Sequence, residues 1–186
     1  PIASLADRSN RRNIVALSLT VWSGMTAVSG LALNYGQLLA ARVGVGIGEA
    51  GGSPPSHSMI SDIFPPEKRA SAIGFYSTGI SIGILFGFLF GGWLNEFFGW
   101  RVAFFVVGVP GVLLAAVLYL TVPEPIRGLT ENRASTGDSP SMLSVFKLLL
   151  SRPSFILMAL GAAMNAFAGY SSSNWIASFM IRTHQM

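Results

Sequence analysis

Hydrophobic residues along this chain are gathered into four long runs that contain no charged side chain. The runs are residues 13–41, 70–95, 102–123 and 153–181. About 20 apolar residues cross a bilayer as a helix, so each of the last three runs is long enough for one span. The first run holds one span and the start of the next, with a turn at 34–36. The pattern predicts an all-α membrane protein with five spans, at about 14–33, 36–61, 70–93, 102–122 and 154–180.

Polar segments between these runs are predicted to be loops on the two sides of the membrane. Residues 1–12 form a short charged loop, and residues 62–69 form a second one, in which two prolines end one helix. Residues 95–101 form a short outside loop with aromatic anchors. The first half of 123–152 is predicted to be a linker, and its second half an amphipathic helix at the cytoplasmic interface.

Charged residues are scarce and unevenly distributed. They make up 11% of the chain, against about 25% in an average soluble domain, and 51% of the residues are hydrophobic. If the N-terminal end is cytoplasmic, the inside segments hold nine Lys and Arg residues and the outside segments hold two. This positive-inside bias fixes the orientation of the spans. We expect a multi-pass protein of the cell (inner) membrane. Acidic residues lie in the same inside segments, so no strongly basic face remains for nucleic acid.

Two further features bear on the kind of protein. The chain has no cysteine, which excludes disulfides and thiolate chemistry. It starts within a predicted loop, and an odd number of spans leaves its ends on opposite sides of the membrane. Both the start and the odd number predict a piece of a longer protein, to which any function would belong.

Arg42 and Glu49 are the charged residues that lie within a predicted span. Seven residues are nearly two helical turns, so both side chains point to one face, roughly 10 Å apart along the axis. A charge at membrane depth costs at least ~2.5 kcal/mol and usually faces a cavity or a partner. The pair therefore fits a proton carrier beside a fixed cation, and Arg42 also suits a phosphate or carboxylate. A structural ion pair within a helix bundle is the alternative.

Glycine recurs at every fourth position of the third predicted span, from Gly79 to Gly91. Such a face lets another helix backbone approach closely, which favours helix association in lipid. Plain helix packing and a packed hinge between moving helices both fit this pattern. The candidate hinge residues are Gly83, Gly87, Gly91 and Gly92.

Other side chains in the spans are weaker candidates. His57 is a weak candidate for titration, and Asp62 is interpreted as an interfacial residue. Tryptophans, Trp22 included, are interpreted as an interfacial belt near the span ends. A polar stripe in the last span either lines a cavity or makes ordinary interhelical hydrogen bonds. Its members are Asn165, Tyr170, Ser171, Ser172, Ser173 and Asn174.

Rival functions find little support in the sequence. It has no metal-ligand cluster and no nucleotide-binding loop, and Ser53, Ser56 and His57 form an unconvincing nucleophile–base group. We therefore expect no enzymatic activity, no cofactor and no metal. A passive channel or a non-transporting receptor would keep the helix bundle but need no protonatable group.

The first loop resembles motif A of the major facilitator superfamily, G-x-L-A-D-R-x-G-R-R. Here it reads Ser4-Leu-Ala-Asp-Arg-Ser-Asn-Arg-Arg12, with Ala3 and Asn10 in place of the two glycines. In that superfamily the loop lies on the cytoplasmic side between the second and third spans and acts as a gate. The resemblance implies this role for Asp7, with Arg8, Arg11 and Arg12 as its partners.

Two further motifs resemble the same superfamily. Arg42-Val-Gly-Val-Gly-Ile-Gly48 resembles its fourth-span motif R-x-x-x-G-x-G. Residues 83–92 resemble its fifth-span antiporter motif, except that Phe88 stands in place of the proline, which weakens a claim of antiport. The Spinster branch of bacterial type is a closer resemblance still, carried by the residues of 42–69, 122–128 and 159–170.

The resemblance covers nearly the whole chain and implies family spans three to seven of twelve. Residues 1–122 would then belong to the N-terminal six-helix bundle, 123–152 to the linker, and 153–186 to the start of the C-terminal bundle. The Spinster branch exports lysolipids or related sphingoid phosphates with proton coupling. Its fourth-span Arg and Glu, implicated in that coupling and in head-group binding, match Arg42 and Glu49.

Together these observations predict a secondary active transporter that moves a lysolipid or a similar amphiphilic anion by alternating access, coupled to protons. Glu49 and Arg42 are the proton-coupling candidates, and they bind substrate together with Asn165 and Tyr170. We expect a monomer whose partners are the bilayer, the amphiphile and protons, without nucleic acid. A carrier of a drug, a sugar or an organic anion is the alternative.

Overall fold

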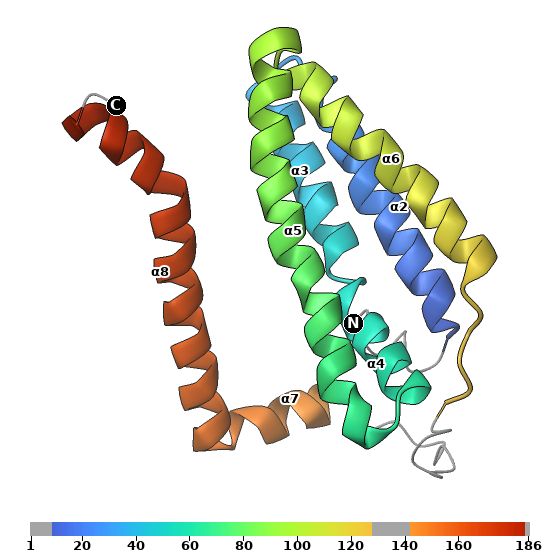
Figure 1. Cartoon of the computed structure of the whole chain (residues 1–186). Coiled ribbons are helices and arrows are strands. Elements are labelled where there is room, and N and C mark those ends of the chain that lie inside the picture. Colours follow the sequence, from blue (N-terminus) through green and yellow to red (C-terminus); the bar gives the residue numbers. More distant parts are fainter. Residues whose placement is uncertain (1–8, 128–141, 185–186) are drawn as a thin grey trace. The chain divides into compact units, whose positions relative to one another are not determined.

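The computed structural model describes residues 9–127 and 142–184, which form helices and connecting segments without a strand (Figure 1). The chain divides into two compact units, Pro1–Gly137 and Asp138–Met186. The first unit contains α2 (Arg11–Ser29), α3 (Tyr35–Glu49), α4 (Ser53–Ile63), α5 (Pro66–Phe98) and α6 (Trp100–Thr121). The second unit contains α7 (Met142–Leu150) and α8 (Pro153–His184).

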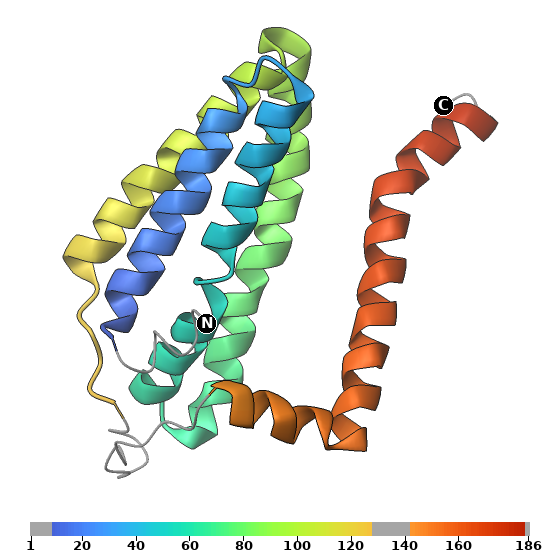
Figure 2. The same ribbon diagram turned by 180° about the vertical axis from the view of Figure 1, so that it is seen from behind.

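Helix α2 is the centre of the first unit, and Figures 1 and 2 show it between α3 and α6. Its partners approach closely because they present glycine. A Cβ atom on Gly108 of α6 would lie 2.6 Å from the backbone nitrogen of Ala27, and one on Gly48 of α3 would lie 2.6 Å from that of Trp22. Glycine at these positions therefore lets helix backbones meet, as small residues do in membrane bundles.

Asparagine side chains define where α2 and α3 begin. The side chain of Asn10 accepts a hydrogen bond from the Asn13 N–H at 3.0 Å, and that of Asn34 accepts one from the Gln37 N–H at 2.9 Å. The Gln37 side chain in turn accepts from the Leu33 N–H at 2.8 Å. These bonds satisfy amide groups that a helix start leaves without intrahelical partners.

The helix expected over 36–61 is two helices, which corrects the sequence interpretation. α3 ends at Glu49, residues 50–52 form a turn, and α4 begins at Ser53. Pro54 and Pro55 have no N–H to donate to the preceding turn, so a continuous helix would lose two of its hydrogen bonds here. Glu49 therefore lies at the end of a helix rather than in the middle of one.

The outside loop expected at 95–101 is also corrected. α5 continues to Phe98, α6 starts at Trp100, and Gly99 alone separates them. Gly99 has φ of 80°, a conformation that glycine adopts without the steric cost that a side chain would impose. One residue is thus enough to reverse the chain between two long helices.

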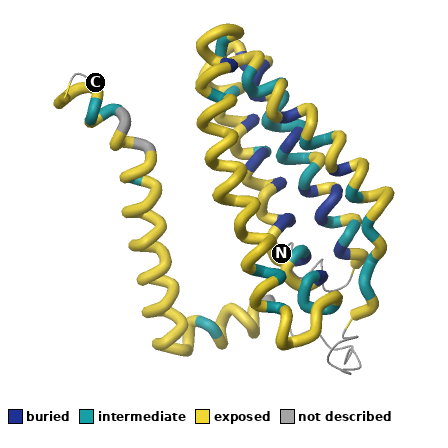
Figure 3. The backbone as a smooth tube through the Cα atoms, viewed as in Figure 1, coloured by how far each residue is buried: buried dark blue, intermediate teal, exposed yellow. Residues whose placement is uncertain are grey.

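Three of the described helices are long and apolar enough to cross a membrane, by length and composition: Pro66–Phe98, Trp100–Thr121 and the Pro153–Ser173 part of α8. Figure 3 shows that most of α5 is exposed, in contrast to the buried positions of α2. Phe75 and Phe88 of α5 are 82% and 73% exposed. In this unit α5 thus presents a broad apolar surface.

Candidate functional site

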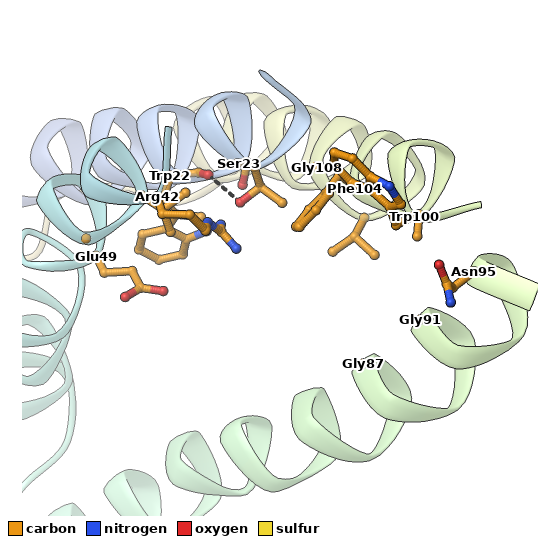
Figure 4. Close-up of a pocket in the computed structure, with 15 residues that line it drawn as sticks. Trp22, Ser23, Arg42, Glu49, Gly87, Gly91, Asn95, Trp100, Phe104 and Gly108 are labelled. Atoms are coloured by element: carbon orange, nitrogen blue, oxygen red, sulfur yellow. Dashed lines mark hydrogen bonds between the residues drawn. The ribbon is translucent and has the colours of Figure 1, made fainter. Parts of the chain in front are cut away.

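A cleft of about 740 Å³ lies between α2, α3, α5 and α6 (Figure 4). Its walls are mainly apolar, with a small number of polar groups, a composition typical of ligand sites. All four helices contribute to it. The residues used below are Trp22, Ser23 and Thr26 of α2, Arg42 and Glu49 of α3, Gly87, Gly91 and Asn95 of α5, and Trp100 and Phe104 of α6.

Arg42 and Glu49, the charged pair singled out in the sequence, both line this cleft. Figure 4 shows both side chains reaching from α3 into the opening. Both residues are exposed, and the described part of the chain has no ion pair that joins them. The Arg42 guanidinium instead lies over the ring of Phe104, with 5.3 Å between its carbon and the ring centroid. Both charges are thus available to a solute or an ion in the cleft.

Two polar or aromatic neighbours of this pair were not identified from the sequence. Trp22, interpreted as part of an interfacial belt, lines the cleft instead, and Asn95, placed in an outside loop, lines it from α5. Trp22, Ser23 and Thr26 all line the cleft, and the two polar residues beside Trp22 were the sequence signal that this face of α2 turns toward a site. Because that signal depends on which helix face is buried, it appears only once the packing is known.

The candidate hinge glycines of α5 fall into two groups. Gly87 and Gly91 line the cleft, whereas Gly83 and Gly92 do not. A Cβ atom on any of the four would meet nothing within 4 Å among the described residues. Their role in helix packing or in a hinge therefore stays a prediction.

The remaining substrate-binding candidates, Asn165 and Tyr170, lie on α8 in the second unit, where both are exposed. Tyr170 lines a hollow on that helix together with Phe167 and Trp175. Its role in substrate binding, like that of Asn165, stays a prediction.

A second charged group, which we call the charged clasp, consists of Arg11, Asp62 and Glu124. Arg11 is only 3% exposed, and its guanidinium donates to Asp62 Oδ2 at 2.5 Å and to Glu124 Oε1 at 2.9 Å. It also donates to the Ser58 hydroxyl at 2.7 Å and to the Pro125 carbonyl at 3.1 Å. The clasp thus joins the start of α2, the end of α4 and the segment after α6.

Two ionisable groups of the clasp have shifted pKa values. Burial acts to raise the pKa of the Glu124 carboxyl, but hydrogen bonds from the Arg12 backbone N–H and the Arg11 side chain hold it below its usual range. Burial likewise acts to lower the pKa of Arg11, and its bonds to Glu124 and Asp62 outweigh that cost and raise it. Both groups are therefore stabilised in their charged forms.

Four residues were expected to form a cytoplasmic gate. Arg11 and Arg12 are described: Arg12 gives its backbone N–H to Glu124 at 2.8 Å, and its guanidinium lies 4.8 Å from the centroid of the Tyr119 ring. Asp7 and Arg8 lie outside the described residues. The sequence singled out Arg11 but not its partner Glu124, because 113 positions separate the two.

The Major Facilitator Superfamily model matches residues 1–186, the whole chain. The chain belongs to the major facilitator superfamily. The expected all-helical fold of this superfamily is thereby confirmed. An MFS-type efflux pump of Mycolicibacterium smegmatis is 33% identical over 100% of this chain and 42% of its own length. Protein spinster homolog 1 of Rattus norvegicus is 32% identical over 96% of this chain and 35% of its own length.

A solved structure is similar over the whole chain. It is the crystal structure of a bacterial homolog to the human lysosomal transporter Spinster, in an inward-facing and unoccupied conformation. It is 38% identical and has a TM-score of 0.76, covering 100% of this chain and 44% of that one. The resemblance to the Spinster branch is thus confirmed, and these relatives are transporters rather than enzymes. The chain spans less than half the length of each of them.

Proposed function

We propose that this chain is part of a secondary transporter that moves an amphiphilic anion, such as a lysolipid, by alternating access with proton coupling. The observation that carries the proposal is that Arg42 and Glu49 line one mainly apolar cleft without an ion pair between them. Charges at membrane depth are costly and usually serve a solute or ion pathway. An apolar cleft with a cation and an acid suits a molecule that has both a tail and an anionic head.

Arg42 is the residue that binds the anionic head group. Its guanidinium offers several N–H donors in a planar fork, which matches phosphate or carboxylate oxygens. The Phe104 ring lies beside the guanidinium and the described residues form no ion pair with it, so its charge remains available to a ligand. We also propose Asn165 and Tyr170 of α8 as substrate-binding residues.

Glu49 is the group that takes up and releases a proton. It faces the same cleft as Arg42, two turns along α3, so a bound anion and a proton would share one site. Binding of the head group to Arg42 would leave Glu49 next to an added negative charge. Protonation of Glu49 would remove that repulsion, which is a direct way to couple the two ligands.

The charged clasp, together with Asp7, Arg8 and Arg12, is the cytoplasmic gate. Arg11 connects α2, α4 and the segment after α6 by side-chain bonds. Such a network can be bonded in one conformation of the transporter and broken in another, as a gate requires. The protein would work as a monomer in the cell (inner) membrane.

Transport of another small solute is the second candidate, and one observation favours it. The efflux pump of M. smegmatis is about as similar to this chain as the Spinster homolog is, at 33% against 32% identity. A drug, a sugar or an organic anion would use the same cleft and the same alternating access. The match between Arg42 and an anionic head group favours the first candidate over a drug or a sugar, and the mainly apolar cleft favours it over a small organic anion.

The test uses the full-length protein that carries this chain, in proteoliposomes filled with a pH-sensitive dye. We expect added lysophospholipid to cause proton movement in the wild type, and Glu49→Gln to abolish it. Glu96→Gln, which removes an exposed carboxylate at the far end of α5, is the matched control and should behave as the wild type does. Arg42→Lys should weaken lysolipid binding more than it changes the proton response.

Each result separates the candidates. Proton movement with a small organic anion or drug, but not with lysophospholipid, would select the second candidate. Lysolipid transport that is unchanged in Glu49→Gln at every pH would rule out Glu49 as the proton carrier. Current at single-channel rates would replace the carrier with a channel.

A further inference from the structure

Trp22 of α2 lies against the joint between α3 and α4. A Cβ atom on Gly48 would lie 2.6 Å from the Trp22 backbone nitrogen, and one on Gly52 would lie 2.7 Å from Cζ3 of its indole. Real Cβ atoms do not approach other atoms so closely, so a side chain at position 48 would collide with the Trp22 backbone, and one at position 52 would force the indole to shift. Gly48 and Gly52, one on each side of Glu49, thus form a notch that Trp22 fills.

The same indole connects this joint to the cleft. Trp22 lines the cleft together with Arg42 and Glu49 (Figure 4). The Gly52 N–H donates to the Glu49 carbonyl at 3.0 Å, so the residue that touches the ring is bonded to the residue that carries the carboxylate. The ring and the end of α3 are thus connected through Gly52.

The prolines make the angle of the joint depend on tertiary contacts. A continuous helix would hold the angle between α3 and α4 by its own hydrogen bonds, but Pro54 and Pro55 cannot donate theirs. The turn at 50–52 keeps bonds such as Gly51 N–H to the Gly48 carbonyl at 3.2 Å, which span only three residues. Packing against the indole is therefore one of the tertiary contacts that define the angle, beside the hydrogen bonds from Arg11 to Ser58 and Asp62 at the other end of α4.

We infer that Trp22 is a positioning residue for the Arg42 and Glu49 site: with its backbone against Gly48 and its indole against Gly52, it helps to set the angle between α3 and α4 and thereby the place of the Glu49 carboxylate in the cleft. The part that concerns transport rests on the proposed function of Glu49. A substrate in the cleft contacts the same ring, so occupancy of the site acts on the joint. This gives a route from ligand binding to movement of α4, which carries one residue of the charged clasp.

The first measurement is structural and independent of transport. This chain has no cysteine, so spin labels can be attached to cysteines introduced at Leu39 of α3 and Ile63 of α4, which are both exposed. The distance between the labels is measured in the full-length protein, with any cysteine elsewhere replaced. Gly52→Ala should shift or broaden this distance, because the new methyl meets the six-membered ring of the indole.

The control variants make the test specific. Trp22→Phe removes the ring atoms Cζ3 and Cη2 that the Gly52 methyl would meet, so it should restore the wild-type distance in Gly52→Ala. Trp22→Phe should not restore the wild-type distance in Gly48→Ala, because there the methyl meets the Trp22 backbone. Gly24→Ala is the matched glycine control on α2, where a Cβ would meet nothing within 4 Å, and should leave the distance unchanged.

The second measurement is the pH profile of transport. Gly52→Ala should weaken substrate binding about tenfold and displace the pH profile of transport, because the added methyl overpacks the joint. The double variant Gly52→Ala with Trp22→Phe should recover most of the affinity and of the wild-type pH profile. An unchanged label distance in Gly52→Ala would overturn the inference. A changed distance with wild-type affinity and pH profile would overturn the positioning role. If the wild type shows no coupled transport, the proposed function fails. The label distance in Gly52→Ala, and its restoration by Trp22→Phe, then still decide whether Trp22 acts on the angle between α3 and α4.

Discussion

Two groups of charged residues, the charged clasp and the Arg42–Glu49 pair, use the same chemical types in opposite ways. Arg11 in the clasp is 3% exposed and donates four hydrogen bonds to protein oxygens. Arg42 in the cleft is exposed, and its described contact is the face of an aromatic ring. The carboxylates differ in the same way: Glu124 is held by Arg11 and Arg12, whereas no ion pair is described for Glu49.

The difference shows which charges hold the fold and which remain for a ligand. Desolvating an arginine is costly unless its donors are satisfied, and the described part of the chain has no buried side-chain nitrogen or oxygen without a partner. The clasp therefore ties three segments together at the end of the bundle. The pair in the cleft contributes little to the fold, and its charges are free to bind. Substitutions in the clasp should therefore lower stability, besides any effect on gating, whereas substitutions of the pair should change transport and leave stability nearly unchanged.

The largest loss of stability is expected for Arg11→Met. Methionine keeps the length of the side chain but leaves Asp62 and Glu124 close together without their cation. We expect the free energy of unfolding to fall by about 3 kcal/mol, the lower end for breaking a buried pair, since both carboxylates are partly exposed. Thermal unfolding of the purified full-length protein measures this change. Arg152→Met, at an exposed arginine, is the control, and an equal melting temperature in both variants would contradict the assignment.

Whether the sequence alone could reveal each of these two groups depends on how far apart along the chain its members lie. The apolar runs predicted helices because span length is a local property, and Arg42 and Glu49 were found because they lie about two helical turns apart. Glu124 was not paired with Arg11, because the two meet only after α2, α4 and α6 have packed. Local patterns therefore singled out two residues that line the cleft, while the clasp required the tertiary fold.

A smaller loss, of about 1.5 kcal/mol, is expected for Glu124→Gln, which weakens hydrogen bonds to a charged group. Because folding lowers the pKa of Glu124, its contribution is complete above the unfolded pKa of about 4.3 and is lost as pH falls through the lower folded value. Wild-type stability should therefore fall below about pH 4.3. Unfolding measured as a function of pH should show a shallower acid loss in Glu124→Gln, and parallel curves would contradict this role.

The helix joint shows a second limit of sequence analysis. Gly51-Gly52-Ser53-Pro54-Pro55 contains strong signals for a break, yet the apolar pattern on both sides predicted one helix over 36–61. Hydrophobicity reports burial, and it does not report whether the backbone hydrogen bonds are continuous. The proline rule, applied alone, places the break correctly.

In the cleft, Phe104→Leu should have a modest effect. It keeps an apolar side chain but removes the ring over which Arg42 lies, an interaction of about 0.5–1 kcal/mol at exposed sites. We expect a several-fold change in the affinity for an anionic ligand, measured by equilibrium binding in detergent, with little change in melting temperature. Phe88→Leu, on the exposed surface of α5, is the matched control. A large loss of stability in Phe104→Leu would mean that the ring is part of the fold rather than a support for Arg42.

The smallest change in stability is expected for Glu49→Gln, and it gives the sharpest contrast with the clasp. Glutamine has nearly the same shape as glutamate. Glu49 is exposed in the cleft, and the described residues form no ion pair with it. The free energy of unfolding should therefore change by less than about 0.5 kcal/mol. Measuring the thermal unfolding of Glu49→Gln and Glu124→Gln side by side compares two acid-to-amide changes in one protein. If Glu49→Gln lost as much stability as Glu124→Gln, Glu49 would have a structural partner. An unchanged melting temperature would instead let any loss of transport in this variant be assigned to the charge itself.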